Sequence, residues 1–138
     1  MDSKRALIFA GTTFILIALF GFFEVLGPGA KNSIFGQGWW LDNAENGSHL
    51  IFGLAFLTSA FFAPASYRKW LAWTFGVALV VFSIYSIVTY HVVHVNVEAP
   101  VEEVIYFALG DLILWGVTRE KRLLGLSKQK TEINNLSI

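Results

Sequence analysis

Apolar residues fall in four long runs, separated by short stretches rich in glycine, proline or charge. The runs cover residues 6–26, 44–63, 70–90 and 101–117. Each is close to the roughly 20 residues that an α-helix needs to cross the hydrocarbon core of a bilayer. Backbone amides in lipid must be paired within their own segment, so the runs predict helices. We therefore predict an all-α, four-helix transmembrane bundle in residues 1–118 and a polar cytoplasmic tail, 119–138, whose last part, residues 127–138, is mobile without a partner.

The composition agrees with a membrane protein. Hydrophobic residues make up 55% of the chain and charged residues 14%, with a mean hydropathy of +0.59. These values are too apolar for a soluble domain of this length. The chain has no cysteine, which excludes disulfides and thiolate metal sites. Its net charge of zero gives no sign of a nucleic-acid partner.

Charged residues divide between the two ends of the predicted bundle. All but one of the ten Lys and Arg residues precede the first helix, lie between the second and third, or follow the fourth. Only Lys31 lies at the opposite end, so the positive-inside rule places both termini in the cytoplasm. Most carboxylates and all three histidines gather at the other end. The predicted molecule has a basic cytoplasmic end and an acidic, histidine-bearing outer end.

Helix-start signals occur at the outer end. Asp42 or Asn43 can cap the second helix, with Glu45 in its first turn. Pro100 suits the first turn of the fourth helix, where carboxylates favour the positive end of the helix dipole.

Candidate ligand side chains gather at this outer end. Carboxylates and imidazoles three or four positions apart share one helix face, which is how helix bundles present metal ligands. The ligand types fit zinc, copper or iron, and two imidazoles could instead hold haem. The candidate metal ligands are Glu45, His49, His91, His94, Glu102 and Glu103. The alternative is a polar rim whose side chains pair with one another or with a partner.

A short pattern recurs at the start of the second and fourth helices. Glu45, Asn46, His49 and Gly53 have the same spacing as Glu102, Glu103, Tyr106 and Gly110. The first copy, N-x-x-H-x-x-x-G after a Phe-rich first helix, resembles a prokaryotic family of small four-helix membrane proteins classed as a domain of unknown function. The resemblance covers residues 6–118 and implies a plasma-membrane location but no established activity. The second copy departs from the family pattern, since Glu103 and Tyr106 stand where Asn and His are expected.

Asp111 lies inside the fourth predicted helix, about 10 Å from its cytoplasmic end. A carboxylate at that depth should face the interior of the bundle, so we predict that Asp111 is buried. A proton path from this residue to the outer cluster would suit a proton-coupled carrier.

No nucleophile triad or phosphate-binding pattern is present, so a non-enzymatic role is favoured and no catalytic residue is identified. The leading prediction is an accessory or structural subunit of a larger membrane assembly. Four short helices enclose little room for a transport path, and Phe-rich helices need lipid or partner helices around them. The expected partners are the lipid bilayer and other integral membrane subunits. A metal- or haem-binding membrane protein and a proton-coupled carrier are the alternatives, and the sequence leaves the partner, substrate and oligomeric state open.

Overall fold

The computed structural model describes residues 1–93 and 100–136, and every regular element in that part of the chain is helical. α1 (Ser3–Phe22) and α2 (Asn43–Phe62) are joined by a loop that contains a short 3₁₀ turn, η1 (Gly36–Gly38). α3 (Ala65–Val93) follows after a short link, and α4 (Pro100–Leu136) comes last. The prediction of an all-α protein with four helices is confirmed for the described residues.

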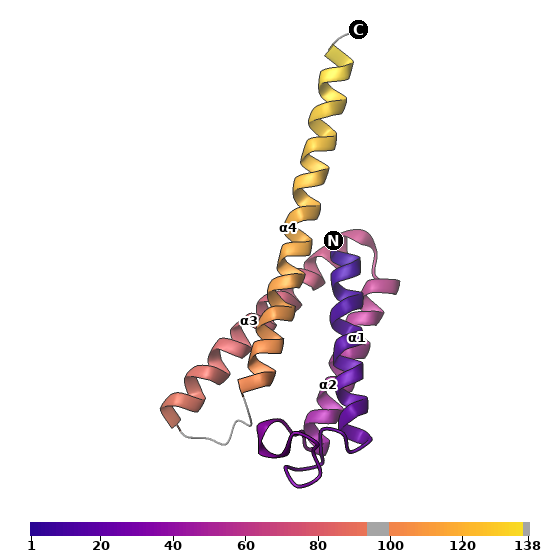
Figure 1. Ribbon diagram of the computed structural model, residues 1–138. Helices are drawn as coiled ribbons and strands as arrows, with labels where there is room; N and C mark the ends of the chain where they lie inside the picture. The colour runs from indigo at the N-terminus through magenta and orange to yellow at the C-terminus, as the bar shows by residue number, and fades with distance from the viewer. Residues whose placement is uncertain (94–99, 137–138) are drawn as a thin grey trace.

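Helices that are neighbours in the chain are also neighbours in space. α1 lies beside α2, and α3 beside α4 (Figure 1). α1 also packs against α4, whereas α2 and α3 contact each other little. The bundle therefore consists of two helix hairpins joined mainly along α1 and α4.

The C-terminal part of α4 projects beyond the other helices, at the end where the N-terminus lies (Figure 1). The predicted polar tail continues α4 as a helix over residues 119–136, and its mobility without a partner stays a prediction. Lys, Arg, Glu, Gln and Leu dominate this segment, all of them are good helix formers, and no proline interrupts it.

Glycines allow close contact within each hairpin. A Cβ atom on Gly11 would lie 2.9 Å from the carbonyl oxygen of Gly53, and one on Gly53 would lie 3.0 Å from that of Gly11. Gly76 and Gly110 approach each other in the same reciprocal way, at 3.1 and 2.9 Å. Small residues at such crossings are typical of helix contacts in membranes. The two hairpins thus use the same packing contact, as the recurring pattern in the sequence suggests.

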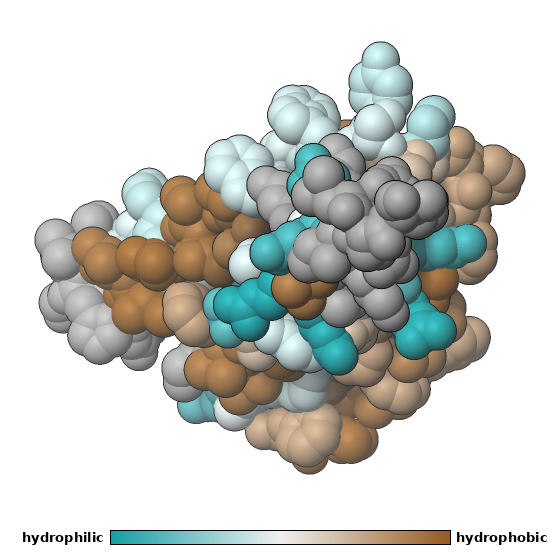
Figure 2. Space-filling view, turned by 90° about the horizontal axis from the view of Figure 1, so that it is seen from above, coloured by the Kyte–Doolittle hydropathy of each residue, from teal (hydrophilic) through white to brown (hydrophobic). Residues whose placement is uncertain are grey.

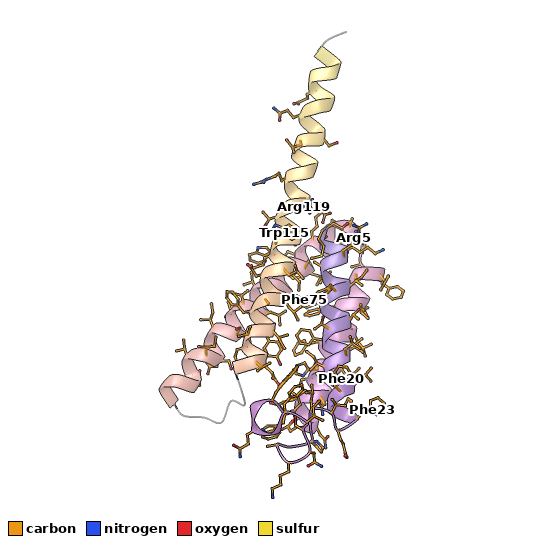
Figure 3. The ribbon with its side chains drawn as sticks, viewed as in Figure 1. Arg5, Phe20, Phe23, Phe75, Trp115 and Arg119 are labelled. Carbon is orange, nitrogen blue, oxygen red and sulfur yellow. The ribbon has the colours of Figure 1, made fainter. Side chains whose placement is uncertain are left out.

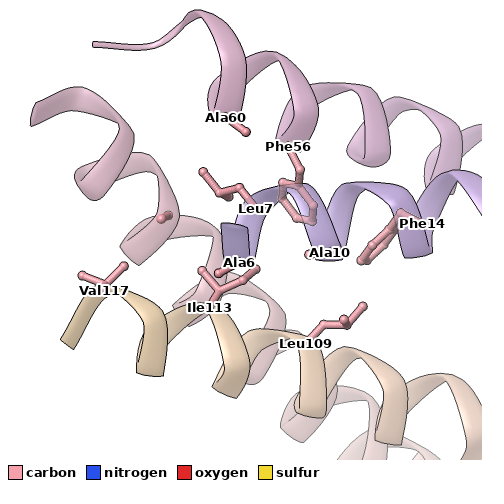
Figure 4. Close-up of a cluster of buried hydrophobic side chains, with 10 residues drawn as sticks. Ala6, Leu7, Ala10, Phe14, Phe56, Ala60, Leu109, Ile113 and Val117 are labelled. Atoms are coloured by element: carbon pink, nitrogen blue, oxygen red, sulfur yellow. The ribbon is translucent and has the colours of Figure 1, made fainter. Parts of the chain in front are cut away.

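The apolar core surrounds α1, which lies between α2 and α4 (Figure 4). Alanines on α1 let the neighbouring helices approach, and Phe14 and Phe56 fill the wider space with their rings edge to face, 5.4 Å between centroids. The core members on these three helices are Ala6, Leu7, Ala10, Phe14, Phe56, Ala60, Leu109, Ile113 and Val117. The core therefore lies around α1, away from the outer faces of α3.

The outside of the bundle carries many exposed apolar side chains. Two helical segments, α1 and Ala65–Thr89 within α3, are long and apolar enough to cross a membrane. Phe9, Phe62 and Tyr85 are among the large side chains that are more than half exposed. In the end-on view of Figure 2, apolar residues lie on the flanks and polar residues gather nearer the centre. Soluble monomers rarely expose so much apolar surface.

Hydrogen bonds stabilise both ends of the bundle. The Asp42 carboxylate accepts the N–H of Glu45 at 2.8 Å, and the Glu45 carboxylate accepts the N–H of Asp42 at 2.7 Å, forming a capping box. At the opposite end, Glu120 accepts hydrogen bonds from the hydroxyl and N–H of Ser3, and its carboxylate lies 3.2 Å from the Lys69 ammonium. Glu120 therefore ties α4 to the starts of α1 and α3.

Candidate functional site

The two copies of the recurring pattern meet where α2 and α4 begin. His49 and Tyr106 occupy equivalent places in the pattern, and Nε2 of His49 lies 2.8 Å from Oη of Tyr106. His49 is only 3% exposed. Its imidazole packs against the ring of Phe14 on α1, at 5.4 Å between centroids. The polar site therefore lies between the hairpins and is backed by aromatic rings.

Hydrogen bonds run from the loop through α4 to α2. The indole N–H of Trp39 donates to Oε1 of Glu102 at 3.3 Å, and Oε2 of Glu102 lies 3.1 Å from Oη of Tyr106. On the far side of Tyr106, Nδ1 of His49 lies 2.7 Å from the carbonyl oxygen of Glu45. A carbonyl oxygen can only accept, so Nδ1 carries a hydrogen and donates it. Nε2 is therefore the nitrogen that exchanges a hydrogen bond with Tyr106.

Asn46 and Glu103, the next equivalent pair, are both buried against the first helix of their own hairpin. Asn46 is 0% exposed and packs so closely on Gly21 that any Cβ there would overlap its side chain. Glu103 is 5% exposed, and the Ser86 hydroxyl donates to its Oε1 at 2.9 Å. Within the described part of the chain, the Asn46 amide and Oε2 of Glu103 have no hydrogen-bond partner. Such groups carry an unmet hydrogen-bonding requirement.

A cavity of about 540 Å³ lies beside these residues, and we call it the interpair cavity. Its polar end is formed by the first turns of α2 and α4 together with Ser86, and its remaining walls are aromatic or aliphatic. Phe75 lies between the hairpins, with its ring centroid 4.7 Å from that of Phe56 (Figure 3). The lining residues are Phe14, Glu45, Ser48, His49, Phe52, Phe56, Phe75, Ala78, Leu79, Phe82, Ser86, Glu102, Glu103 and Tyr106.

The rim of the cavity lies on the flank of the bundle. Phe52 on α2 and Phe82 on α3 line the cavity, yet they are 52% and 55% exposed. These two helices contact each other little, so the space between them is not closed by packing. The cavity is therefore accessible from the side that an embedding bilayer would cover.

Four of the six predicted metal ligands, Glu45, His49, Glu102 and Glu103, line this one cavity. His94 and the side chain of His91 lie outside the described residues, so a shared ion between them and His49 stays a prediction. Among the described side chains, no group of three or more His, Asp or Glu is arranged to hold a metal ion. Both nitrogens of His49 already have protein partners. Zinc, copper, iron and haem binding therefore stay predictions without a described ligand set.

The structure differs from the prediction that Asp111 is buried. Its side chain is exposed in the described bundle. α4 turns Gly110 towards α3 and Ile113 towards α1, which leaves Asp111 on the remaining face with Phe107 and Trp115. Those two neighbours are 44% and 51% exposed. Asp111 does not line the interpair cavity, so the described structure offers no route between it and the outer cluster.

Trp39 is a member of the site that the sequence pattern does not reveal. No spacing rule connects a loop residue to Glu102 far along the chain. Its indole is positioned by the loop fold, in which Leu41 N–H donates to the carbonyl oxygen of Leu26 at 2.6 Å and the Ser33 hydroxyl bonds to the carbonyl oxygen of Trp39. Tyr106, in contrast, could be assigned to the site from the sequence, because it is equivalent to His49 in the recurring pattern.

No family model matches the chain, and neither a curated protein nor a solved structure does. The resemblance based on Asn46, His49 and Gly53 therefore stays a hypothesis.

Proposed function

We propose that the protein is an integral membrane protein that binds an amphipathic organic molecule in the interpair cavity. The observation that carries this proposal is the division of the cavity lining, polar at one end and aromatic along the rest. Ligand sites are commonly apolar concavities with a few convergent polar groups. A molecule with a hydrogen-bonding head and an apolar body would fit both parts.

All four helices would cross the membrane in this proposal, with both termini in the cytoplasm. α1 and Ala65–Thr89 support this proposal, because each is long and apolar enough for a span. α2 packs along α1 and α4 along α3 through the glycine contacts, so each would cross the membrane beside its partner. Arg5, Trp115 and Arg119 lie towards the same end of the bundle (Figure 3), as the positive-inside rule requires. Cysteine labelling in intact cells tests the topology, since Lys31→Cys should react from outside and Gln129→Cys should not.

Photolabelling of the purified protein in detergent tests the binding proposal. A dodecanol derivative with a diazirine in its chain should label the segments around Phe52 and Phe82. Ala78 lines the cavity and is exposed, so Ala78→Phe should fill the space and reduce the labelling. Ala108→Phe is the matched control, because Ala108 is exposed but does not line the cavity. Labelling spread evenly over all exposed helix faces, and unchanged by Ala78→Phe, would contradict the proposal.

The role of an accessory subunit is the second candidate, and the position of Asp111 favours it. Asp111 lies about 16 Å along α4 from Pro100, near the middle of the proposed span. An outward carboxylate there would cost roughly 2.5–3.5 kcal/mol in lipid. A neighbouring transmembrane helix with a hydrogen-bond donor would remove that cost. The neighbour in this proposal belongs to another integral membrane protein.

Association through Asp111 can be tested by co-purification from native membranes. Asp111→Asn should retain the partner because it keeps hydrogen bonding, whereas Asp111→Leu should lose it. Loss of the partner should leave the thermal stability of the chain itself unchanged or higher, since leucine suits lipid. An identical assembly around both variants would place the interface elsewhere, and a complex of this chain alone would replace the partner by a second copy.

A further inference from the structure

The charges around the interpair cavity are one-sided. Its lining contains three glutamates and one histidine, and no Lys or Arg is among the described lining residues. The apolar walls include five phenylalanines, whose faces attract cations. An anionic head would meet carboxylates at the polar end, whereas a cationic head would meet opposite charge and aromatic faces.

Glu103 adds an acceptor that requires a donor. The residue is only 5% exposed, and it lines the cavity. The Ser86 hydroxyl satisfies only Oε1 of its carboxylate. Oε2 has no partner among the described residues. Leaving a buried acceptor unpaired is unfavourable, and more so when the group is charged. Oε2 itself has almost no exposed surface, so the Glu103 carboxylate must rotate for a bound N–H group in the cavity to satisfy it, and a quaternary ammonium head would not satisfy it in any rotamer.

Tyr106 restricts the protons at the site. Its hydroxyl has one hydrogen but lies within hydrogen-bond distance of both His49 Nε2 and Glu102 Oε2. It can donate to one of them, and the other must then donate to it. Either Glu102 is protonated and His49 is neutral, or Glu102 is ionised and His49 is protonated. Both arrangements hold the same single proton between the two residues.

We propose that the interpair cavity binds an amphipathic organic ammonium ion with at least one N–H. This inference rests on the proposed function and names the ligand class of the same site. The ammonium donates to Oε2 of Glu103 and lies near Glu102, while its apolar body lies against the phenylalanine rings.

The test compares dodecylammonium with dodecanol, which has the same chain and an uncharged donor head. Binding is measured by equilibrium dialysis of the protein in phosphatidylcholine nanodiscs, with empty nanodiscs subtracted. At about pH 8 the ammonium should bind at least tenfold more tightly than the alcohol. Glu103→Gln and Glu102→Gln should each reduce the preference, whereas Glu132→Gln, on the exposed extension of α4, should not.

The outcomes of this test separate the cation preference from the proposed function. Equal affinities for the two probes would overturn the cation preference and leave the amphiphile site standing. Failure of both probes to bind would overturn the proposed function and this inference together. A preference that survives Glu103→Gln in a folded variant would place the cation elsewhere. The two-probe comparison on the unmodified protein decides the charge preference even if a variant does not fold.

Discussion

Replacing Gly53 by alanine is the sharpest test of the hairpin packing. An added Cβ would lie 2.6 Å from Cγ1 of Ile15, 3.0 Å from Ile15 N and 3.0 Å from the carbonyl oxygen of Gly11. The Ile15 side chain can rotate, but the other two atoms belong to the backbone of α1. The helices must therefore separate by a few tenths of an ångström, and overpacking of this kind costs typically about 1–3 kcal/mol.

Gly47 provides a matched control in the same helix, because a Cβ there would meet nothing within 4 Å. Alanine is favoured over glycine in a helix by about 1 kcal/mol, and both variants receive this gain. Gly47→Ala should therefore be stabilising, and Gly53→Ala should be less stable than Gly47→Ala by about 1–3 kcal/mol. The difference isolates the helix contact from helix propensity.

The assay is reversible unfolding in mixed micelles by SDS titration, followed by circular dichroism. The second hairpin repeats the experiment, since a Cβ on Gly110 would lie 2.9 Å from the carbonyl oxygen of Gly76 and one on Gly125 would meet nothing. Gly110→Ala should lose stability relative to Gly125→Ala by a similar amount. If Gly53→Ala proves as stable as Gly47→Ala, the close approach of α1 and α2 is wrong.

Two further predictions concern the two polar ends of the bundle. Tyr106→Phe removes the hydroxyl between His49 and Glu102 and should cost about 1–3 kcal/mol of unfolding free energy, because buried groups lose their partner. Tyr85→Phe, at an exposed position, should cost almost nothing. Equal effects of the two substitutions would show that Tyr106 makes no structural hydrogen bonds. Outside the proposed spans, burial tends to raise the pKa of Glu120, but hydrogen bonds from Ser3 and the nearby Lys69 ammonium outweigh it and lower the pKa from its ordinary value of 4.5. Because the folded pKa is the lower one, this stabilisation is complete above about pH 4.5 and is lost as pH falls through the folded value. The loss should be below about 1 kcal/mol for a partly exposed group and should be absent in Glu120→Gln, so an identical acid dependence of the two proteins would contradict the assignment.

Local signals in the sequence determined the helices and their starts. The four apolar runs, the capping residue Asp42 and the proline at position 100 correspond to the observed helices, because hydrophobic length and cap chemistry act within a few residues. The polar side chains of the cavity could also be proposed in advance. Glu45, His49, Glu102 and Glu103 stand near the starts of their helices, and α2 and α4 run in the same direction.

Only the tertiary structure decided which faces meet. α4 is apolar nearly all round over residues 104–117, so its sequence does not say whether Asp111 points inward; the glycine contact with α3 and the packing of Ile113 on α1 turn it outward. The pairing of His49 with Tyr106, and the bond from Trp39 to Glu102, likewise join residues far apart in the chain. Such contacts depend on how whole helices cross, and crossing is set by side-chain packing between elements rather than by the periodicity of any one of them.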